Sequence, residues 1–571
     1  MEIGFMKNYA LLESAEYVNM RELIEIVCEK FKEKTAYSYR VNPRDKQSVK
    51  VSFEKLRDDV RALGTEFISR GYVGKHIAVT GKLSYQWIAT YYALIACGAV
   101  IVPLDAEWEG ADLANTVAFA ECAALLSDRE MSAKTDLILA EADIADHILL
   151  NGTEEDGKDT WQKLVELGNE KLAGGYDAYF ENDIDPDKLS LIVFTSGTTG
   201  KGKGVMLTQH MILSDIAEGL KYVQVTPKSI SLLPLHHTFG STVNLVGQLI
   251  GGVEVYLSSG IRYVLKELKS EKPTHLILVP LYLETFHRKI MANIKEKGKE
   301  DLVRKMMKVS NGLRKIGIDN RRIFFKDILA AFGGELQFVI SGGAPISQEL
   351  IDDFDAWGIT IINGYGITEC APLISVNRNK YQIKGSVGLV LPCDEVKIAS
   401  PNESGEGEIR VKGPNVMLGY YKDPESTTEV FDEEGYFRTG DFGRLDEEGA
   451  LYITGRLKNL IILSNGKNVY PEEIEKVFSG VPGVQDAVVY EGQSKRGTEF
   501  NAIVLEVFPD EEYCKANNIE DMQVYLQKFV EDYNRKAVPY KKVGLLKVRK
   551  EDFPKNTLRK IQRFKMNKTI D

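Results

Sequence analysis

The sequence lacks the patterns that disulfide frameworks and metal clusters require. It has six cysteines among 571 residues, and they are scattered, with no C-x-x-C pair and no metal-ligand spacing. This distribution predicts a reduced intracellular protein. The seven histidines include no H-E-x-x-H sequence, and the adjacent His236 and His237 are poorly arranged as two ligands of one metal. The sequence therefore offers no indication of a zinc site.

The sequence also lacks an apolar run long enough to cross a bilayer. The longest such run, residues 91–104, contains Gly98 and Pro103 and stops at Asp105, short of the roughly 20 residues that a membrane helix needs. Residues 1–17 hold acids among apolar residues and show no basic-then-apolar signal pattern. We therefore expect a cytoplasmic protein, with peripheral contact to a membrane as an open alternative.

Composition and length indicate a soluble globular protein of two or more domains. Hydrophobic residues make up 44% and charged residues 27% of the 571 positions, and a chain of this length exceeds one ordinary core. The net charge of −11 argues against a general nucleic-acid binder. It does not exclude phosphate ligands, which respond to local charge.

Apolar strands alternate with helical patterns through the first part of the chain. This alternation predicts an α/β fold with a parallel sheet covered on both faces. In such a sheet, ligands bind at the carboxyl ends of the strands. The expected helices are 54–71 and 85–97, and the expected strands are 76–79, 99–104, 123–126, 148–150, 191–194, 275–279 and 336–340.

The glycine-rich stretch "FTSGTTGKGKGV", residues 194–205, follows the apolar run 191–194. Glycines let backbone N–H groups approach a ligand, and hydroxyl and lysine side chains add donors and positive charge. The stretch fits G-x-x-x-x-G-K, but Gly204 stands where a P-loop has the serine or threonine that binds Mg²⁺. We predict a phosphate-binding loop that is not of the Walker type.

Residues 281–334 read as a helical insertion with an excess of positive charge. They contain 13 lysines and arginines against six acids, a net of +7 in a chain of −11. Solvated helix faces explain such a stretch, and so does a basic surface for an anionic membrane or for CoA. The terminal stretch 541–571 is also basic, with eleven cations against three acids.

From Cys393 the pattern changes to short strands and turns, exemplified by "GEGEIRVKG" and "GALYITGR". A helix flanked by strands then follows to the end of the chain. We predict a division into an N-terminal domain, residues 1–456, a hinge, residues 457–460, and a small α+β domain, residues 461–571.

Seven motifs in fixed order resemble the adenylate-forming superfamily of acyl-CoA synthetases, peptide-synthetase adenylation domains and firefly luciferase. "IILSNGKNVYPEEIE" and the insertion are most similar to long-chain fatty acyl-CoA synthetases. The resemblance implies a large N-terminal domain of layered sheets and helices with a small β-rich subdomain, and a small mobile C-terminal domain. The motifs are "TSGTTGKGKGV", "LPLHHTFG", "SGGAP", "NGYGITE", "YFRTGD", "GRLKN" and "PKNTLRKIQR".

The resemblance also implies roles for individual residues. Glu369 and Thr195 would bind Mg²⁺, Lys560 would reach the carboxylate and the α-phosphate, His237 would line the acyl entrance, and Lys458 would be the pivot of the hinge. The implied phosphate ligands are Thr195, Ser196, Gly197, Thr198, Thr199, Gly200 and Lys203. The implied adenine and ribose contacts are Gly343, Ala344, Pro345, Asn363, Gly364, Tyr365, Gly366, Thr368, Asp441 and Arg456.

Each of these residues also has an ordinary structural explanation. Glu369 can cap a helix, Tyr365 and His237 can be core residues, and Lys560 can be one exposed lysine in a basic tail. The sequence departs from the family pattern in two places: Gly202 replaces a usual proline, and Arg559 replaces the glycine that commonly precedes the lysine.

The implied reaction is activation of a carboxylic acid by Mg-ATP to acyl-AMP and pyrophosphate, followed by transfer to CoA. A medium- to long-chain fatty acid is the expected substrate. An acyl–carrier-protein ligase and an adenylating enzyme for an aryl or amino acid remain as alternatives. Two other classes of function are disfavoured. An NTPase or kinase does not fit Gly204. A catalytically silent nucleotide-binding scaffold does not explain the joint presence of Thr195, Glu369, Asp441 and Lys560.

Overall fold

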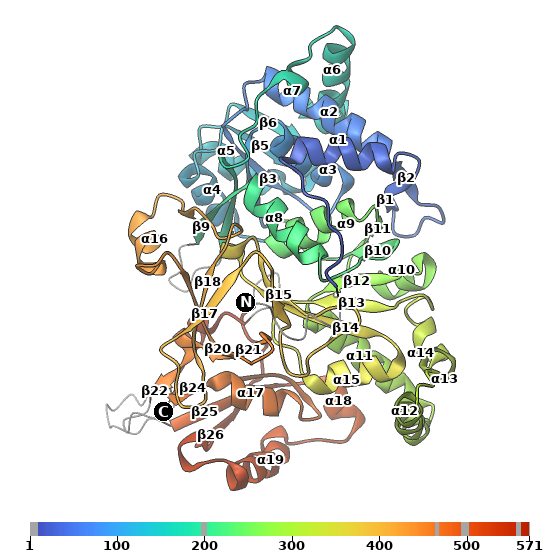
Figure 1. Cartoon of the computed structure of the whole chain (residues 1–571), viewed down its shortest axis with the longest axis vertical. Coiled ribbons are helices and arrows are strands. Elements are labelled where there is room, and N and C mark those ends of the chain that lie inside the picture. Colours follow the sequence, from blue (N-terminus) through green and yellow to red (C-terminus); the bar gives the residue numbers. More distant parts are fainter. Residues whose placement is uncertain (1–9, 196–201, 463–467, 493–501, 556–560, 570–571) are drawn as a thin grey trace. The chain divides into compact units, whose positions relative to one another are not determined.

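The computed structural model of the chain describes residues 10–195, 202–462, 468–492, 502–555 and 561–569 (Figure 1). Contacts between residues divide the chain into two compact units. Unit 1 comprises Met1–Glu395 and Lys412–Phe431, and unit 2 comprises Val396–Val411 and Asp432–Asp571. Each unit has hydrophobic clusters of its own.

An eight-stranded sheet, in the order β19-β9-β8-β4-β3-β5-β6-β7, forms one layer of unit 1. The strands from β8 to β7 are parallel, and β9 and β19 are added antiparallel at one edge. The central strands are apolar and buried because helices cover both faces of a parallel sheet. The strands are β3 (His76–Thr80), β4 (Val100–Leu104), β5 (Ala124–Ser127), β6 (Asp146–Leu149), β7 (Asp159–Thr160), β8 (Leu189–Thr195), β9 (Lys203–Thr208) and β19 (Gly419–Tyr420).

Several helices of unit 1 begin at residues whose side chains satisfy the free N–H groups of the first turn. Ser52 accepts from the backbone N–H of Lys55 at the start of α2, and Ser84 does so from Trp87 at the start of α3. α3 is buried around almost its whole circumference, as expected of a helix inside a domain. The described helices of unit 1 outside the insertion, capped or not, are α1 (Met20–Lys30), α2 (Phe53–Ser69), α3 (Tyr85–Ala96), α4 (Gly110–Phe119), α5 (Ser132–Glu141), α6 (Trp161–Ala173), α7 (Ala178–Glu181), α8 (Gln209–Leu220), α9 (Gly247–Ile250), α10 (Val264–Glu271) and α16 (Pro424–Val430).

Two further sheets complete the strands of unit 1. One has the order β12-β13-β14-β15-β16, and the other the order β10-β11-β1-β2. In the first, β12, β13 and β14 are parallel, so "SGGAP" after β13 and "NGYG" at the end of β14 lie at the same edge. The strands are β1 (Thr35–Tyr39), β2 (Val49–Ser52), β10 (Lys228–Ser231), β11 (Glu254–Leu257), β12 (His275–Leu278), β13 (Phe338–Ser341), β14 (Thr360–Gly366), β15 (Leu373–Val376) and β16 (Leu389–Val390).

The predicted insertion is helical and lies at the outer margin of unit 1 (Figure 1). Its buried face joins the cluster that contains Phe286, Phe332, Phe354 and Trp357. The helices involved are α11 (Pro280–Glu296), α12 (Glu300–Arg314), α13 (Arg321–Phe324), α14 (Lys326–Ala330) and, next to them, α15 (Gln348–Trp357).

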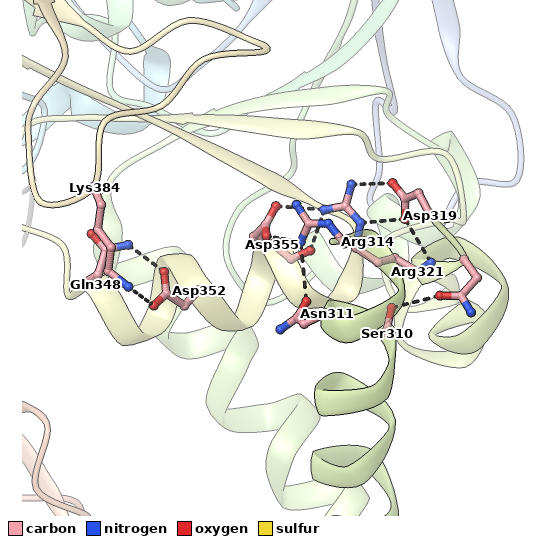
Figure 2. Close-up of polar contacts among 10 residues, drawn as sticks. Ser310, Asn311, Arg314, Asp319, Arg321, Gln348, Asp352, Asp355 and Lys384 are labelled. Atoms are coloured by element: carbon pink, nitrogen blue, oxygen red, sulfur yellow. Dashed lines mark hydrogen bonds and ion pairs between the residues drawn. The ribbon is translucent and has the colours of Figure 1, made fainter. Parts of the chain in front are cut away.

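Asp355, in α15, binds two arginines of the insertion (Figure 2). Arg314 Nη1 donates to its Oδ2 at 2.6 Å, and Arg321 Nη1 donates to its Oδ1 at 2.8 Å. Arg321 also donates to Asp319, and this hydrogen bond is the main cause that lowers the pKa of Asp319 to about 2. The segment between α12 and α13 is therefore fixed to α15, the helix between β13 and β14.

The described residues of unit 2 form three smaller sheets and three α-helices. A four-stranded sheet has the order β17-β18-β20-β21, a pair is formed by β22 and β23, and a three-stranded sheet has the order β24-β25-β26. Its strands are β17 (Glu395–Ala399), β18 (Gly407–Lys412), β20 (Phe437–Leu445), β21 (Leu451–Arg456), β22 (Ile461–Ile462), β23 (Asn468–Val469), β24 (Val484–Gly492), β25 (Ala502–Pro509) and β26 (Leu545–Val548). Its helices are α17 (Pro471–Ser479), α18 (Glu511–Ala516) and α19 (Met522–Lys536).

The expected α/β class and the helical insertion are confirmed. The contact division places residues 396–411 and 432–456 with the C-terminal residues. The predicted division into 1–456, 457–460 and 461–571 stays a prediction, because a hinge is defined by motion and not by contact density. Within the ranges that the structure describes, no helix is long and apolar enough to cross a membrane.

Candidate active site

The two ends of the predicted phosphate loop are paired in the eight-stranded sheet. Thr195, the last residue of β8, is the register partner of Lys203, the first residue of β9, and its hydroxyl donates to the Lys203 carbonyl at 3.4 Å. A Cβ on Gly204 would lie 3.0 Å from Ile192 Cγ2, so the glycine permits close packing of this hairpin. The remaining predicted phosphate ligands, Ser196, Gly197, Thr198, Thr199 and Gly200, lie outside the described residues.

Glu369 and Lys203 are joined through the side chain of Tyr420. The Tyr420 hydroxyl donates to Glu369 Oε1 at 3.0 Å, and Lys203 Nζ lies 4.6 Å from the centre of the tyrosine ring. The cation–ring contact and the hydrogen bond place the ammonium and the carboxylate on the same tyrosine. Burial and then the charge of Glu369 raise the pKa of Tyr420, so this hydroxyl stays protonated and acts as a donor.

Strand pairing holds Tyr420 in this position. β19 is only two residues long, and its Tyr420 pairs with Val205 of β9, two residues after Lys203. The backbone N–H of Met417 donates to the carbonyl of Glu369 at 2.8 Å. Segments around positions 203, 369 and 420 therefore meet through backbone hydrogen bonds as well as through side chains.

The "SGGAP" and "NGYG" segments approach each other and the predicted gate segment. A Cβ on Gly342 would lie 3.4 Å from the Phe239 ring and 3.7 Å from the carbonyl oxygen of Gly364. Gly343 has φ of +82°, a conformation that favours glycine. Ala344 and Pro345 follow it, one half-buried and the other exposed, at the end of β13.

The end of β14 is held against β15. Asn363 Nδ2 donates to the carbonyl of Ser386, and a Cβ on Gly366 would lie 2.0 Å from the carbonyl oxygen of Pro372. Glycine is thus required at Gly366 for the close approach of two backbones. Tyr365 and Thr368 are half-buried, and Thr368 begins the 3₁₀ turn that carries Glu369.

A cluster of buried polar groups lies behind this edge of the sheet. Asp215 Oδ1 accepts from the backbone N–H of Leu373 at 3.0 Å and from Asn415 Nδ2 at 3.2 Å, and Asn415 Nδ2 also lies 3.2 Å from Asp394 Oδ2. Burial raises the pKa of Asp394 to about 7 and also raises that of Asp215, where the Asp394 charge adds to the effect.

The predicted gate residue His237 lies beside His236 at the start of a π-helical segment, Phe239–Val246. The two rings are 4.3 Å apart, and His236 Nε2 lies 3.5 Å from Asp105. Burial lowers the pKa of His236. π-Helical segments occur frequently at functional sites, and the role of His237 stays a prediction.

The other predicted ribose residues belong to unit 2. Asp441 and Arg456 are register partners in β20 and β21, and Arg456 Nε lies 2.8 Å from the buried Asp441 carboxylate. Lys458, the predicted pivot, is exposed in a 3₁₀ turn, and its neighbour Asn459 donates to Glu472 of α17 at 2.6 Å. Lys560 lies outside the described residues; beside it in sequence, Lys555 and Ile561 form an antiparallel bridge.

Four polar residues described above are not predicted from the sequence: Tyr420, Asp215, Asp394 and Asn415. Tyr420 is 51 positions from Glu369 in the chain, and no spacing rule connects them. The only local signal was a Gly-Tyr-Tyr sequence at 419–421. The part of the chain that the structure describes contains no group of three or more His, Cys, Asp and Glu side chains that could hold a metal by itself.

The sequence of the chain matches a protein family and several of its characterised members. A family model described as AMP-binding enzyme matches residues 24–421. The chain is 30% identical to long-chain-fatty-acid–CoA ligase 5 of Rattus norvegicus, over 80% of this chain and 71% of the relative. It is 26% identical to the chloroplastic long-chain-fatty-acid–acyl-carrier-protein ligase AEE15 of Arabidopsis thaliana, over 94% of this chain and 82% of the relative.

The fold also matches solved structures. The anthranilate CoA ligase AuaEII in complex with anthranoyl-AMP superposes with a TM-score of 0.77 at 17% identity, covering 99% of this chain and 98% of that chain. At this identity the likeness shows the fold alone. The matches confirm the resemblance that the ordered motifs predict.

The raised pKa of Asp394 predicts a pH-dependent loss of stability. A carboxyl with a pKa of about 7 in the fold and about 4 when unfolded stabilises the fold fully below pH 4, and this contribution is lost as the pH rises toward 7. Asp394→Asn removes this titration. We expect the melting temperature of the variant, relative to the parent, to rise on the order of 3 °C between pH 5 and pH 8.

The control is Asp327→Asn, which changes an exposed carboxylate in the same unit. Thermal unfolding of the three proteins at both pH values measures the effect. A melting-temperature difference for Asp394→Asn that does not change with pH would contradict the assignment.

Proposed function

The chain belongs to the AMP-binding enzyme family, and we propose that it activates a medium- to long-chain fatty acid with ATP and transfers the acyl group to CoA. The contact of Glu369, Tyr420 and Lys203 carries this proposal. It brings a carboxylate and an ammonium group to the end of the hairpin that holds the predicted phosphate loop. The names of the long-chain-fatty-acid–CoA ligases support the choice of acid.

The reaction consists of two displacement steps, each of which forms one bond and breaks another. The acid's carboxylate oxygen attacks the α-phosphorus of ATP, the bond to the β-phosphate oxygen breaks, and acyl-AMP and pyrophosphate form. The CoA thiolate then attacks the acyl carbon, and AMP leaves with its electron pair. Negative charge builds on phosphate oxygens in the first step, so fixed positive groups accelerate it. Lys203 and, by the family resemblance, Lys560 are the proposed groups.

The residues present suit a magnesium ion. Tyr420 donates to Glu369 Oε1, and Glu369 Oε2 accepts from no donor among the described residues. Thr195 offers a hydroxyl oxygen. Mg²⁺ prefers such oxygen ligands and completes its coordination with phosphate oxygens and water. The bound ion would supply positive charge between the phosphate oxygens of ATP. Glu369 and Thr195 are its proposed protein ligands.

Nucleotide recognition is proposed for two groups of residues. In unit 1, Tyr365 would present its ring to adenine, with backbone and polar groups of the neighbouring segments around it. In unit 2, the Asp441 carboxylate would accept from the ribose hydroxyls and Arg456 would contact ribose or phosphate. The unit 1 group comprises Gly343, Ala344, Pro345, Asn363, Gly364, Tyr365, Gly366 and Thr368.

Two further roles complete the proposal. His237 would line the entrance for the acyl chain, because it precedes the π-helical segment whose Phe239 approaches the "SGGAP" segment. Lys458 would be the pivot about which residues 461–571 move between the two half-reactions, because it is exposed in a short turn.

Acyl transfer to a carrier protein is the second candidate. It is favoured by one observation: the match to the Arabidopsis acyl-carrier-protein ligase covers 94% of this chain. The activation step is the same in both cases, so the two candidates differ only in the thiol that accepts the acyl group. Aryl acids are a further alternative for the first substrate.

The function is tested by following the products from Mg-ATP with a panel of acids. We expect AMP and pyrophosphate with palmitic, oleic or octanoic acid, weaker release with benzoic acid, and acyl-CoA only when CoA is added. Replacement of CoA by a phosphopantetheinylated carrier protein separates the two acceptors. Formation of ADP without AMP would contradict adenylation.

Glu369→Gln tests the metal ligand. Glutamine keeps the size of the side chain and an oxygen that can accept from Tyr420, but it removes the charge. We expect pyrophosphate release to fall roughly 10²-fold or more, because a charged ligand at a transferring phosphate contributes several kcal/mol. Glu506→Gln is the control, since Glu506 of unit 2 belongs to none of the motifs and also accepts from a tyrosine, Tyr490, and from Arg549. Parent-like rates in Glu369→Gln would make Glu369 structural.

Lys560→Ala separates the half-reactions. The lysine is proposed to act on charge that develops only while the carboxylate attacks ATP. We expect acyl-AMP formation to be nearly abolished, while thioester formation from supplied acyl-AMP and CoA stays close to that of the parent. Lys550→Ala, in the same basic stretch, serves as the control. If Lys560→Ala impaired both steps equally, the role assigned to this lysine would be wrong.

A further inference from the structure

The end of the helical insertion exposes several large aliphatic side chains. Ile323 is 77% exposed, Ile316 71%, Val309 55%, Leu302 54% and Ile318 51%. They lie on α12, on the segment after it and on α13, at the outer margin of unit 1 (Figure 1). We call residues 297–326 the insertion tip. Single exposed aliphatic residues are common on proteins, but a group of them marks an interaction surface.

The exposed residues of α12 are separate from its buried face. Val303, Met306 and Met307 pack against the cluster around Phe354, whereas Leu302 and Val309, spaced by seven residues, share a different stripe. The helix thus has one apolar stripe for the core and a second one for solvent. Packing within unit 1 explains the stripe that faces the core, but not the apolar stripe that faces solvent.

Lysines are interspersed with these aliphatic residues along the same segment of the chain. Five of them are exposed and form no ion pair among the described residues, in contrast to Arg304, Arg314 and Arg321, which bind carboxylates. The tip therefore combines uncompensated positive charge with apolar side chains. The five are Lys297, Lys299, Lys305, Lys308 and Lys315.

A basic cavity of about 390 Å³ adjoins the tip at α13. Its cations are Lys269, Lys272, Arg322 and Lys326, against one lining acid, Glu335. Arg322 directly precedes Ile323, and its guanidinium donates to the carbonyl oxygens of Leu336 and Gly334 at 2.8 and 2.6 Å. Its charge is thereby fixed in place without being neutralised. Such a cavity suits an anionic headgroup such as a phosphodiester.

We propose that the insertion tip docks on an anionic phospholipid bilayer. Its aliphatic side chains would enter the headgroup region and its lysines and the basic cavity would bind lipid phosphates. The composition favours a bilayer over a protein partner, because protein interfaces are enriched in aromatic residues and arginine and depleted in lysine. The inference goes beyond the proposed function, and it suits a fatty acid as substrate, which partitions into membranes.

The contacts of Asp355 give this surface a fixed orientation. Arg314 and Arg321 bind its carboxylate from the two ends of the segment that carries Ile316 and Ile318 (Figure 2). A docking surface held in one conformation loses less entropy on binding than a mobile one. The tip can therefore present its aliphatic groups together.

The proposal is tested by flotation of the full chain with vesicles of phosphatidylcholine alone and of equal parts phosphatidylcholine and phosphatidylglycerol. We expect binding to the anionic vesicles only, weakened by added salt. Since each lysine near an anionic surface contributes about fivefold to partitioning, Lys305→Glu with Lys308→Glu should weaken binding about 25-fold or more. Ile316→Ser with Ile323→Ser should weaken it about tenfold.

Matched controls make the same changes elsewhere. Lys542→Glu with Lys550→Glu alters exposed lysines of the other basic stretch, and Val41→Ser with Val524→Ser alters valines that are 78% and 69% exposed. Each control variant should weaken vesicle binding much less than the tip variant that carries the same kind of change. Thermal unfolding verifies that each variant is folded.

The proposal is overturned if the parent does not float with anionic vesicles, or if the tip and control variants lose binding equally. It is also overturned if the tip variants abolish self-association or carrier-protein binding but leave vesicle binding unchanged. The flotation assay uses no ATP, acid or CoA. Tip-dependent vesicle binding by a chain that forms no acyl-CoA would therefore support this inference while refuting the proposed function.

Discussion

The buried carboxylate of Asp215 joins segments of unit 1 that are far apart in the sequence. It accepts from the backbone N–H of Leu373 and from the side chain of Asn415, and its helix α8 follows directly on β9, a strand of the phosphate hairpin. Loss of these hydrogen bonds would leave Asp215 Oδ1 unpaired in the interior, as its Oδ2 already is among the described residues. A further unpaired buried polar group would be unfavourable by several kcal/mol, on the order of 2–7, so these contacts favour one arrangement of the segments. The hydrogen bond from Tyr420 to Glu369 depends on that arrangement, since Asn415 and Leu373 lie in the segments that carry the two residues.

Local patterns in the sequence were sufficient for some parts of this site and not for others. Glu369 and Lys203 lie within continuous motifs, and the apolar run 191–194 before the motif of Lys203 predicts a strand that the structure contains as β8. Tyr420 reaches Glu369 only because the two-residue strand β19 pairs with β9 in one register. Asp394 likewise belongs to the buried polar cluster through its contact with Asn415, which a local sequence pattern does not predict. Register between distant strands is a tertiary property, and a pattern within one segment does not determine it.

In the insertion too, the sequence predicts the local structure, whereas tertiary packing decides which residues are buried. The sequence predicts its helices and its net charge of +7. The period of α12 identifies apolar positions, but it does not tell which of them the rest of unit 1 covers. Val303 is packed against the core cluster, whereas Val309 is left exposed. The packing of α12 against α11, α13 and α15 determines which of its stripes is buried, and Asp355 of α15 binds Arg314 and Arg321 at the end of this packing.

Positive charge alone does not distinguish the insertion from the end of the chain. Residues 281–334 carry +7 and residues 541–571 carry +8, so the remaining residues carry −26 in a chain of −11. An anionic surface attracts both basic stretches over a screening distance of about 8 Å at physiological salt. Exposed aliphatic groups act only on contact, because the hydrophobic effect is proportional to the area removed from water. The orientation of the protein on an anionic surface therefore depends on where positive charge and exposed aliphatic side chains occur together. Within the described residues, they do so in the segment around Ile316 and Ile323.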